Sequence, residues 1–216
     1  MKFTVFLFWV ALLVFPGCSA VRSSAPDVLF LQAQDWDIQY SPSMPAHPLP
    51  ATDGAWFFDF PVDPGSVHYV SVPYNQSAAH QSVSLTFRIT TSGAPFYNSL
   101  DTGCNNTPAH VRLYLQRQND DMRSDGNRWW SNPASYELGS NDNQTITIEV
   151  PLTADKWSGL SGKFGHSSLQ SQQWFQATLS NLGRIGMTFG GGCSFGHGVS
   201  ISGGTARFTL IHLAVV

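Results

Sequence analysis

The chain has 216 residues, of which 12% are charged, and its formal net charge is −3 at pH 7. This length is enough for one well-buried domain, and the weakly acidic balance excludes the basic surface that nucleic-acid binding requires. Because charges are few while polar and aromatic residues are many, the composition suits neutral, hydroxyl-rich ligands better than anionic ones.

The N-terminus has the organisation of a secretory signal peptide. Lys2 precedes an apolar run over residues 3–15, and small residues follow up to Ala20. The run is too short for a permanent membrane span, and no later segment is long and apolar enough for one. We therefore predict a signal peptide over residues 1–20 and a single mature domain over residues 21–216, exported to the periplasm or the cell exterior.

Two processing routes fit this N-terminus. An ordinary signal peptidase would cut after Ala20 and release a soluble protein. The sequence GCS around Cys18 also resembles a bacterial lipobox, although the two residues before it depart from the usual pattern. Cleavage before Cys18 would leave that residue lipidated, so that acyl chains would anchor the protein to a membrane.

Export also bears on the oxidation state of Cys104 and Cys193, the two cysteines that the mature protein keeps under either processing route. In an oxidising compartment, two such cysteines predict a disulfide bond. Two buried thiols are the alternative. A zinc site is disfavoured because the two residues lack the close spacing of zinc ligands.

The rest of the chain is dominated by alternation of apolar and polar residues. In QSVSLTFRIT, for example, Val83, Leu85 and Phe87 alternate with polar neighbours, as a strand with one buried face requires. Strands are predicted at residues 28–38, 54–60, 66–72, 82–90, 109–117, 144–150, 184–189 and 205–215. The last of these is apolar on both faces from Leu210 onward, which is typical of a central strand.

One segment has helical spacing instead. Leu169, Trp174, Ala177 and Leu182 recur at roughly helical intervals, and stop signals follow. We predict one short helix near residues 169–181. Many short strands with one minor helix indicate an all-β fold, an antiparallel β-sandwich of the jelly-roll type.

The glycine-rich stretch over residues 186–210 is not a nucleotide-binding loop. It lacks the Gly-Lys-Ser/Thr of a phosphate loop, and strand-like residues rather than a helix follow it. We interpret it as a tight corner that joins strand 184–189 to strand 205–215, because glycine permits positive φ and close backbone approach. His197 is then a hydrogen-bonded corner residue; a ligand or base is the alternative.

Four segments carry a resemblance to a known class of protein: WSGLSGKFG, WFQATLSNLGRIGMTFGGG, FGHGVSISGGTARFTL and VRLYLQRQNDD…NRWWS. Together they resemble secreted bacterial jelly-roll modules of the galactose-binding-like and carbohydrate-binding kind, over about residues 80–216. The resemblance implies a β-sandwich fold and export. It also implies that aromatic and polar groups on a sheet face or edge loop would bind sugar, and that a structural calcium ion is common.

The candidate ligand-binding residues combine aromatic rings with polar groups. A sugar offers an apolar face of C–H groups for stacking and a rim of hydroxyls for hydrogen bonding, which rings and Arg, Asp or Asn side chains satisfy. These candidates are Arg88, Arg112, Tyr114, Asp121, Arg128, Trp129 and Trp130. If strands 82–90 and 109–117 lie in one sheet, these groups would line one concave surface. The alternative is that the adjacent tryptophans divide between core and surface.

Metal binding and catalysis have weaker signals. Carboxylates near the first strands could hold a structural calcium ion through oxygen ligands: Asp35, Asp37, Asp53, Asp59 and Asp63. We expect no other cofactor. His197 with Tyr114 and Arg112 could abstract a proton beside a uronate carboxylate, as in a polysaccharide lyase, whereas Glu149 lacks an identifiable partner for glycoside hydrolysis.

The sequence therefore predicts a non-catalytic module that binds a glycan or polysaccharide. The alternatives are a jelly-roll lyase or glycoside hydrolase, and a structural protein of the cell envelope.

Overall fold

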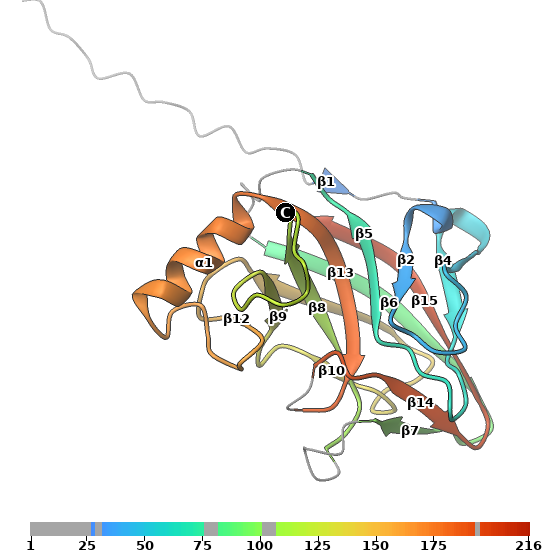
Figure 1. Cartoon of the computed structure of the whole chain (residues 1–216). Helices are drawn as coiled ribbons and strands as arrows, with labels where there is room; N and C mark the ends of the chain where they lie inside the picture. Colours follow the sequence, from blue (N-terminus) through green and yellow to red (C-terminus); the bar gives the residue numbers. More distant parts are fainter. Residues whose placement is uncertain (1–26, 29–31, 76–81, 101–106, 193–194) are drawn as a thin grey trace, which may run out of the picture.

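The computed structural model describes residues 27–28, 32–75, 82–100, 107–192 and 195–216. Within them, the chain forms two antiparallel sheets that face each other across one hydrophobic core, with one α-helix at an end of the sandwich (Figure 1). The prediction of an antiparallel β-sandwich with one short helix is confirmed. Among the described residues, no helix has the length and hydropathy of a transmembrane span.

Several predictions fall on residues outside the described ranges. The signal peptide, the lipid anchor at Cys18 and the disulfide bond between Cys104 and Cys193 all belong to this group. They stay predictions from the sequence.

The first sheet, called sheet A, is built around the C-terminal strand. Its spatial order is β11 (Thr145–Pro151), β6 (Ser82–Ser92), β15 (Thr205–Val215), β4 (Trp56–Asp59) and β3 (Leu49–Pro50), and β1 (Asp27–Val28) pairs with the end of β15. The central position predicted for strand 205–215 is confirmed. Its expected burial on both faces is only partly met, because a bulge between Leu210 and His212 leaves Ile211 exposed.

The second sheet, called sheet B, carries the candidate site. Its spatial order is β12 (Trp157–Ser158), β9 (Arg128–Ser131), β8 (His110–Arg117), β13 (Leu182–Gly190), β5 (Tyr69–Pro73) and β2 (Asp37–Gln39), and β10 (Tyr136–Glu137) pairs with β8. A separate small sheet joins β7 (Phe96–Ser99) to β14 (Val199–Ser202).

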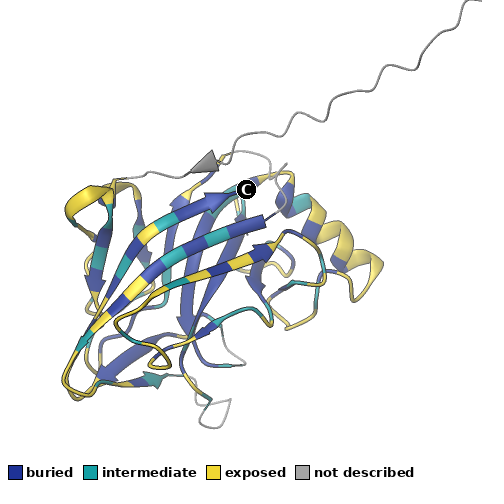
Figure 2. Ribbon diagram, turned by 180° about the vertical axis from the view of Figure 1, so that it is seen from behind, coloured by how far each residue is buried: buried dark blue, intermediate teal, exposed yellow. Residues whose placement is uncertain are grey.

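Period-two alternation determines which side chains form the core. Val83, Leu85, Phe87 and Ile89 of β6 are almost fully buried, while residues between them are partly exposed, as Figure 2 shows along the strands of sheet A. The aromatic centre of the core is the Phe208 ring, which stacks on Phe87 with centroids 5.0 Å apart.

The predicted strand over residues 28–38 is interrupted. A short 3-10 turn, η1 (Ala33–Asp35), lies between β1 and β2, and the Asp35 carboxylate accepts a hydrogen bond from the Gln32 backbone N–H at 2.9 Å. This local bond competes with strand pairing and turns the chain before β2 begins. A second 3-10 turn, η2 (Thr52–Gly54), precedes β4.

The glycine-rich stretch also differs from the prediction. The two strands that it was expected to join lie in different sheets, β13 in sheet B and β15 in sheet A. Along the chain, β14 of the small sheet comes between these two strands. The stretch is therefore a crossover with a strand of its own rather than one tight corner.

The helix α1 spans Leu169–Leu179, close to the predicted residues 169–181. It begins where the Ser168 hydroxyl accepts a hydrogen bond from the backbone N–H of Ser171. The face that it buries is not the predicted one: Phe175 and Leu179 pack into the core, whereas the Trp174 side of the helix faces solvent. In Figure 2 the helix is correspondingly exposed along most of its length.

Candidate functional site

The candidate site is the outer face of sheet B, meaning the face that points away from the core. On β8, Val111, Leu113 and Leu115 enter the core, so Arg112 and Tyr114 between them point outward. The outer face collects side chains from four neighbouring strands: Tyr69 of β5, Arg112, Tyr114 and Gln116 of β8, Arg128 and Trp130 of β9, and Arg184 of β13.

Aromatic rings form a continuous row across this face. The Tyr114 ring lies 5.2 Å from the Tyr69 ring and 5.5 Å from the Trp130 ring, measured between centroids, and Trp130 in turn contacts Phe195. The Tyr69 and Tyr114 rings meet across β13 at a position where Gly186 contributes no side chain. A Cβ atom on Gly186 would lie 2.3 Å from the Val70 carbonyl oxygen, so only glycine fits there.

Arg112 lies in this row without a carboxylate partner among the described residues. Its Nη1 donates a hydrogen bond to the Ser131 carbonyl at 3.2 Å, and its guanidinium carbon lies 4.1 Å from the centroid of the Phe195 ring. Burial lowers the pKa of Arg112 to about 10, which still leaves the guanidinium charged at neutral pH. The Phe195 ring therefore covers a buried cation.

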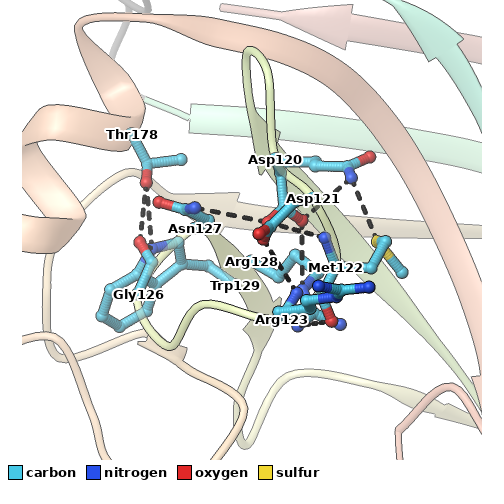
Figure 3. Close-up of polar contacts among 10 residues, drawn as sticks. Asp120, Asp121, Met122, Arg123, Gly126, Asn127, Arg128, Trp129 and Thr178 are labelled. Atoms are coloured by element: carbon cyan, nitrogen blue, oxygen red, sulfur yellow. Dashed lines mark hydrogen bonds and ion pairs between the residues drawn. The ribbon is translucent and has the colours of Figure 1, made fainter.

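The loop between β8 and β9 is fixed to the same face by a buried carboxylate, that of Asp120 (Figure 3). Its Oδ2 lies 3.2 Å from Arg128 Nε and accepts a hydrogen bond from Gln116 Nε2 at 3.0 Å. Its Oδ1 accepts from the Met122 backbone N–H and from Asn127 Nδ2. Arg128 Nε forms an ion pair with Asp120, but its N–H is not aligned for a hydrogen bond to the carboxylate. Arg128 Nη2 donates a hydrogen bond to the Met122 carbonyl at 2.8 Å.

A second loop, residues 195–198, closes the opposite side. His68 Nδ1–H donates to the Gly196 carbonyl at 3.1 Å, so in the neutral ring Nε2 is the acceptor for the Ser66 hydroxyl, 2.7 Å away. Burial, together with the nearby His197, lowers the pKa of His68. Gly198 has φ +102°, and a Cβ there would lie 2.3 Å from His68 Nε2, so the loop is fitted to that ring.

Between these loops the outer face is hollowed into a cavity of about 100 Å³, called here the aromatic cavity. Its lining comprises Tyr69, Trp130, Phe195, Gly196 and His197, with Gly159, Leu160 and Gly162 on the facing turn. The Trp130 side chain is buried, yet its indole N–H has no hydrogen-bond partner among the described residues. The same is true of the Tyr114 hydroxyl beside it. The indole nitrogen itself is closed to solvent, so Trp130 borders the cavity with its ring.

A larger hollow lies on the other side of the turn over residues 159–163 and is called the Trp174 groove. It measures about 380 Å³ and is lined by this turn and by the start of α1. Its lining comprises Asp125, Gly126, Trp129, Gly159, Leu160, Ser161, Lys163, Ser167, Ser168, Gln170, Ser171 and Trp174. Gly159 and Leu160 line both hollows, so the two are contiguous.

The structure brings together four of the seven predicted ligand-binding residues. Arg112, Tyr114, Arg128 and Trp130 share the outer face of sheet B. All four are buried under the covering loops rather than open to solvent. They form the floor of the site, and only Trp130 of these four lines the aromatic cavity.

The other three predicted residues lie elsewhere. Arg88 is exposed on β6 of sheet A, so the condition that strands 82–90 and 109–117 share a sheet is wrong. Trp129 is in the core, where its indole N–H donates to the Gly126 carbonyl and to Thr178 Oγ1, and it borders the Trp174 groove rather than the outer face of sheet B. Asp121 is exposed and accepts a hydrogen bond from the Arg123 backbone N–H.

His197 also differs from the expectation of a hydrogen-bonded corner residue. Its side chain is exposed and lines the aromatic cavity, whereas His68 makes the hydrogen bonds that hold this corner. Sequence reasoning missed Tyr69, Phe195 and Trp174 as site residues, and of the adjacent aspartates it selected Asp121 instead of Asp120. Only Tyr69 had a signal, since it alternates with Val70 and Val72 in its predicted strand.

The carboxylates proposed for calcium do not converge within the described residues, where no group of three His, Cys, Asp or Glu is placed to hold a metal ion. Asp37 pairs with Arg184, and Asp59 forms a two-pronged contact with Arg207 at 2.7 and 3.0 Å. Calcium binding rests on the sequence resemblance.

A hollow of about 730 Å³ lies away from this face, beside β7 and β10. Residues 95–99 and 107–109 form part of its wall, and they flank residues 101–106, which are outside the described ranges. We assign no site there.

No protein-family model matches the chain, and no curated protein matches it significantly. Solved structures with a similar fold include the xylan-binding module CBM15, which is 11% identical, with 87% of this chain and 97% of that chain covered and a TM-score of 0.43. The L4b domain of human laminin alpha-2 is also 11% identical, with 71% of each chain covered and a TM-score of 0.36. At these TM-scores the likeness carries no argument about function.

Proposed function

We propose that the protein binds a glycan on the outer face of sheet B, with the aromatic cavity as the primary subsite. The observation that carries the proposal is a cavity walled by the aromatic side chains of Tyr69, Trp130 and Phe195. A sugar complements such a lining, because its C–H faces pack on rings and its hydroxyls exchange hydrogen bonds with polar groups. Tyr69 and His197 add polar groups that can donate to or accept from other hydroxyls.

Catalysis by a lyase mechanism is less well supported. Tyr114 is almost fully buried, and burial raises its pKa well above 10, as it also raises the pKa of Tyr69. A tyrosine that abstracts a proton needs the opposite shift. Glycoside hydrolysis needs a pair of carboxylates, and Asp125 is the single acidic residue among the described residues that line the two hollows, while Glu149 of β11 lies in sheet A.

A glycan array followed by isothermal titration calorimetry tests the proposal. We expect Trp130→Phe to weaken binding by about 1 kcal/mol, since it replaces the indole wall of the cavity with a smaller ring. The substitution breaks no hydrogen bond to another described residue, so folding should be retained. Phe96→Ala, an exposed ring on β7 away from the site, is the matched control and should bind normally.

Three outcomes separate the classes of function. Binding without product supports a non-catalytic module, and a product of cleavage or elimination would assign an enzyme instead. Absence of binding to any glycan would contradict the proposal and favour a structural role in the cell envelope.

A further inference from the structure

The Trp174 groove has the size and lining of a binding site in its own right. It is several times larger than the aromatic cavity, at about 380 Å³ against 100 Å³. The cavity holds no more than part of one sugar ring, whereas the groove has room for complete rings. A ligand restricted to the cavity would therefore leave most of the hollowed surface empty.

Trp174 provides a fixed aromatic platform in this groove. Its side chain is 39% exposed, although five other tryptophans of the described chain are buried. The ring packs against Gly126, where a Cβ atom would lie 2.6 Å from Trp174 Cγ, so one side of the indole is held in place. Because Phe175 and Leu179 anchor α1 in the core, the helix does not require Trp174 for its attachment.

The rest of the groove is polar and suits hydroxyl groups. Around the platform lie hydrogen-bond donors and acceptors, among them one acidic and one basic side chain: Asp125, Ser161, Lys163 and Gln170. The hydroxyl of Ser168, in contrast, already caps the helix, so the helix start contributes no free backbone donor at Ser171. A ring platform with a mixed polar rim matches a neutral or singly acidic sugar better than a purely apolar ligand.

The turn that separates the two hollows is a fixed ridge. The Gly159 backbone N–H donates to the Lys163 carbonyl, and the Gly162 N–H donates to the Gly159 carbonyl, each at 2.9 Å. Leu160, half exposed at the top of the turn, lines both hollows. A chain-like ligand bound on both sides must cross this residue.

We infer that the Trp174 groove is a second subsite of the same glycan site and that the ligand is an oligosaccharide which spans the turn at Leu160. The inference rests on the proposed function and extends it to a class of ligand. Trp174 stacks on one sugar unit, while Trp130 contacts the unit bound in the aromatic cavity.

The test measures affinity against chain length. Cello-, xylo- and manno-oligosaccharides from monosaccharide to hexasaccharide are titrated by calorimetry into the wild-type protein, Trp174→Ala, Trp130→Phe and the control Phe96→Ala. In the series that binds, wild-type affinity should rise at least about tenfold with length, as expected for an added aromatic anchor. Trp174→Ala should remove this rise, whereas Trp130→Phe should weaken every length.

The outcomes distinguish the two levels of the proposal. Affinity that is independent of length in the wild type, or a rise that survives in Trp174→Ala, overturns the second subsite and leaves the cavity intact. No binding of any sugar to any variant overturns the proposed function itself. If Trp174→Ala does not fold, Gln170→Ala at the exposed rim replaces it, and an unchanged length dependence in that variant overturns the inference.

Discussion

Removal of the Asp120 carboxylate should be among the most damaging single substitutions in this protein. The side chain of Asp120 has no exposed surface, and the side chain of its partner Arg128 is only 6% exposed. Asp120→Ala would leave a buried guanidinium without its counter-ion. It would also remove the acceptor of Gln116, Asn127 and the Met122 backbone N–H.

The expected loss follows from the cost of an unpaired buried charge. Breaking a buried ion pair by deleting one partner costs about 3–5 kcal/mol, a large share of the 5–15 kcal/mol by which typical domains are stable. Asp120→Asn keeps the volume and some hydrogen bonds but removes the charge, so it should cost about 1.5–3 kcal/mol. Replacing both partners with apolar residues, Asp120→Leu with Arg128→Met, should cost less than Asp120→Ala alone.

Urea denaturation followed by circular dichroism measures these losses, provided that the m-value stays constant. Asp59→Ala is the matched control, because Asp59 forms an exposed two-pronged ion pair with Arg207 and should cost no more than about 1 kcal/mol. A loss in Asp120→Ala as small as that in the control would refute the reasoning, since it would mean that water reaches Arg128 in the native state.

Three further predictions concern other parts of the fold. Because burial lowers the pKa of His68 below 6.5, the neutral ring favours the folded state, and the free energy of unfolding should fall as pH drops from 7.5 to 5. His68→Gln should flatten that dependence, and an unaltered pH profile would exclude His68 as its source. Gly198→Ala should destabilise by more than 1 kcal/mol in thermal denaturation, because the residue has φ +102° and no space beside His68. Intact-mass analysis after alkylation should find Cys104 and Cys193 protected until reduction; the loop of about 90 residues makes such a bridge worth about 4 kcal/mol. Two thiols that alkylate in the native protein would disprove the bridge.

Alternation in the sequence was enough to predict most long strands of the sandwich. β6, β8, β11 and β15 lie where their period-two patterns placed them, because each has one face on the core. Other short strands were missed, since two to four residues carry too little pattern: β3, β7, β9, β10, β12 and β14. Sheet membership was also hidden from local pattern: Arg88 and Arg112 occupy similar polar faces but lie in different sheets.

The candidate site shows the same limit. Alternation predicts that Trp129 and Trp130 point to opposite sides of their strand, but it does not say which side is the core. Trp174 illustrates the converse, because its spacing suggested a core position and the helix instead buries the face with Phe175. The loops that cover Arg112 and Tyr114 depend on contacts distant in sequence, such as that between His68 and Gly196.

The unequal exposure of the tryptophans gives the protein a built-in optical probe. Five described tryptophans are at most 3% exposed and one is 39% exposed, namely Trp36, Trp56, Trp129, Trp130 and Trp157 against Trp174. A water-soluble quencher such as acrylamide reaches an indole only from solvent, so quenching of the intrinsic fluorescence of the folded domain reports mainly on Trp174. Occupation of the groove would shield that indole and shift its emission to shorter wavelength, without any dye or label.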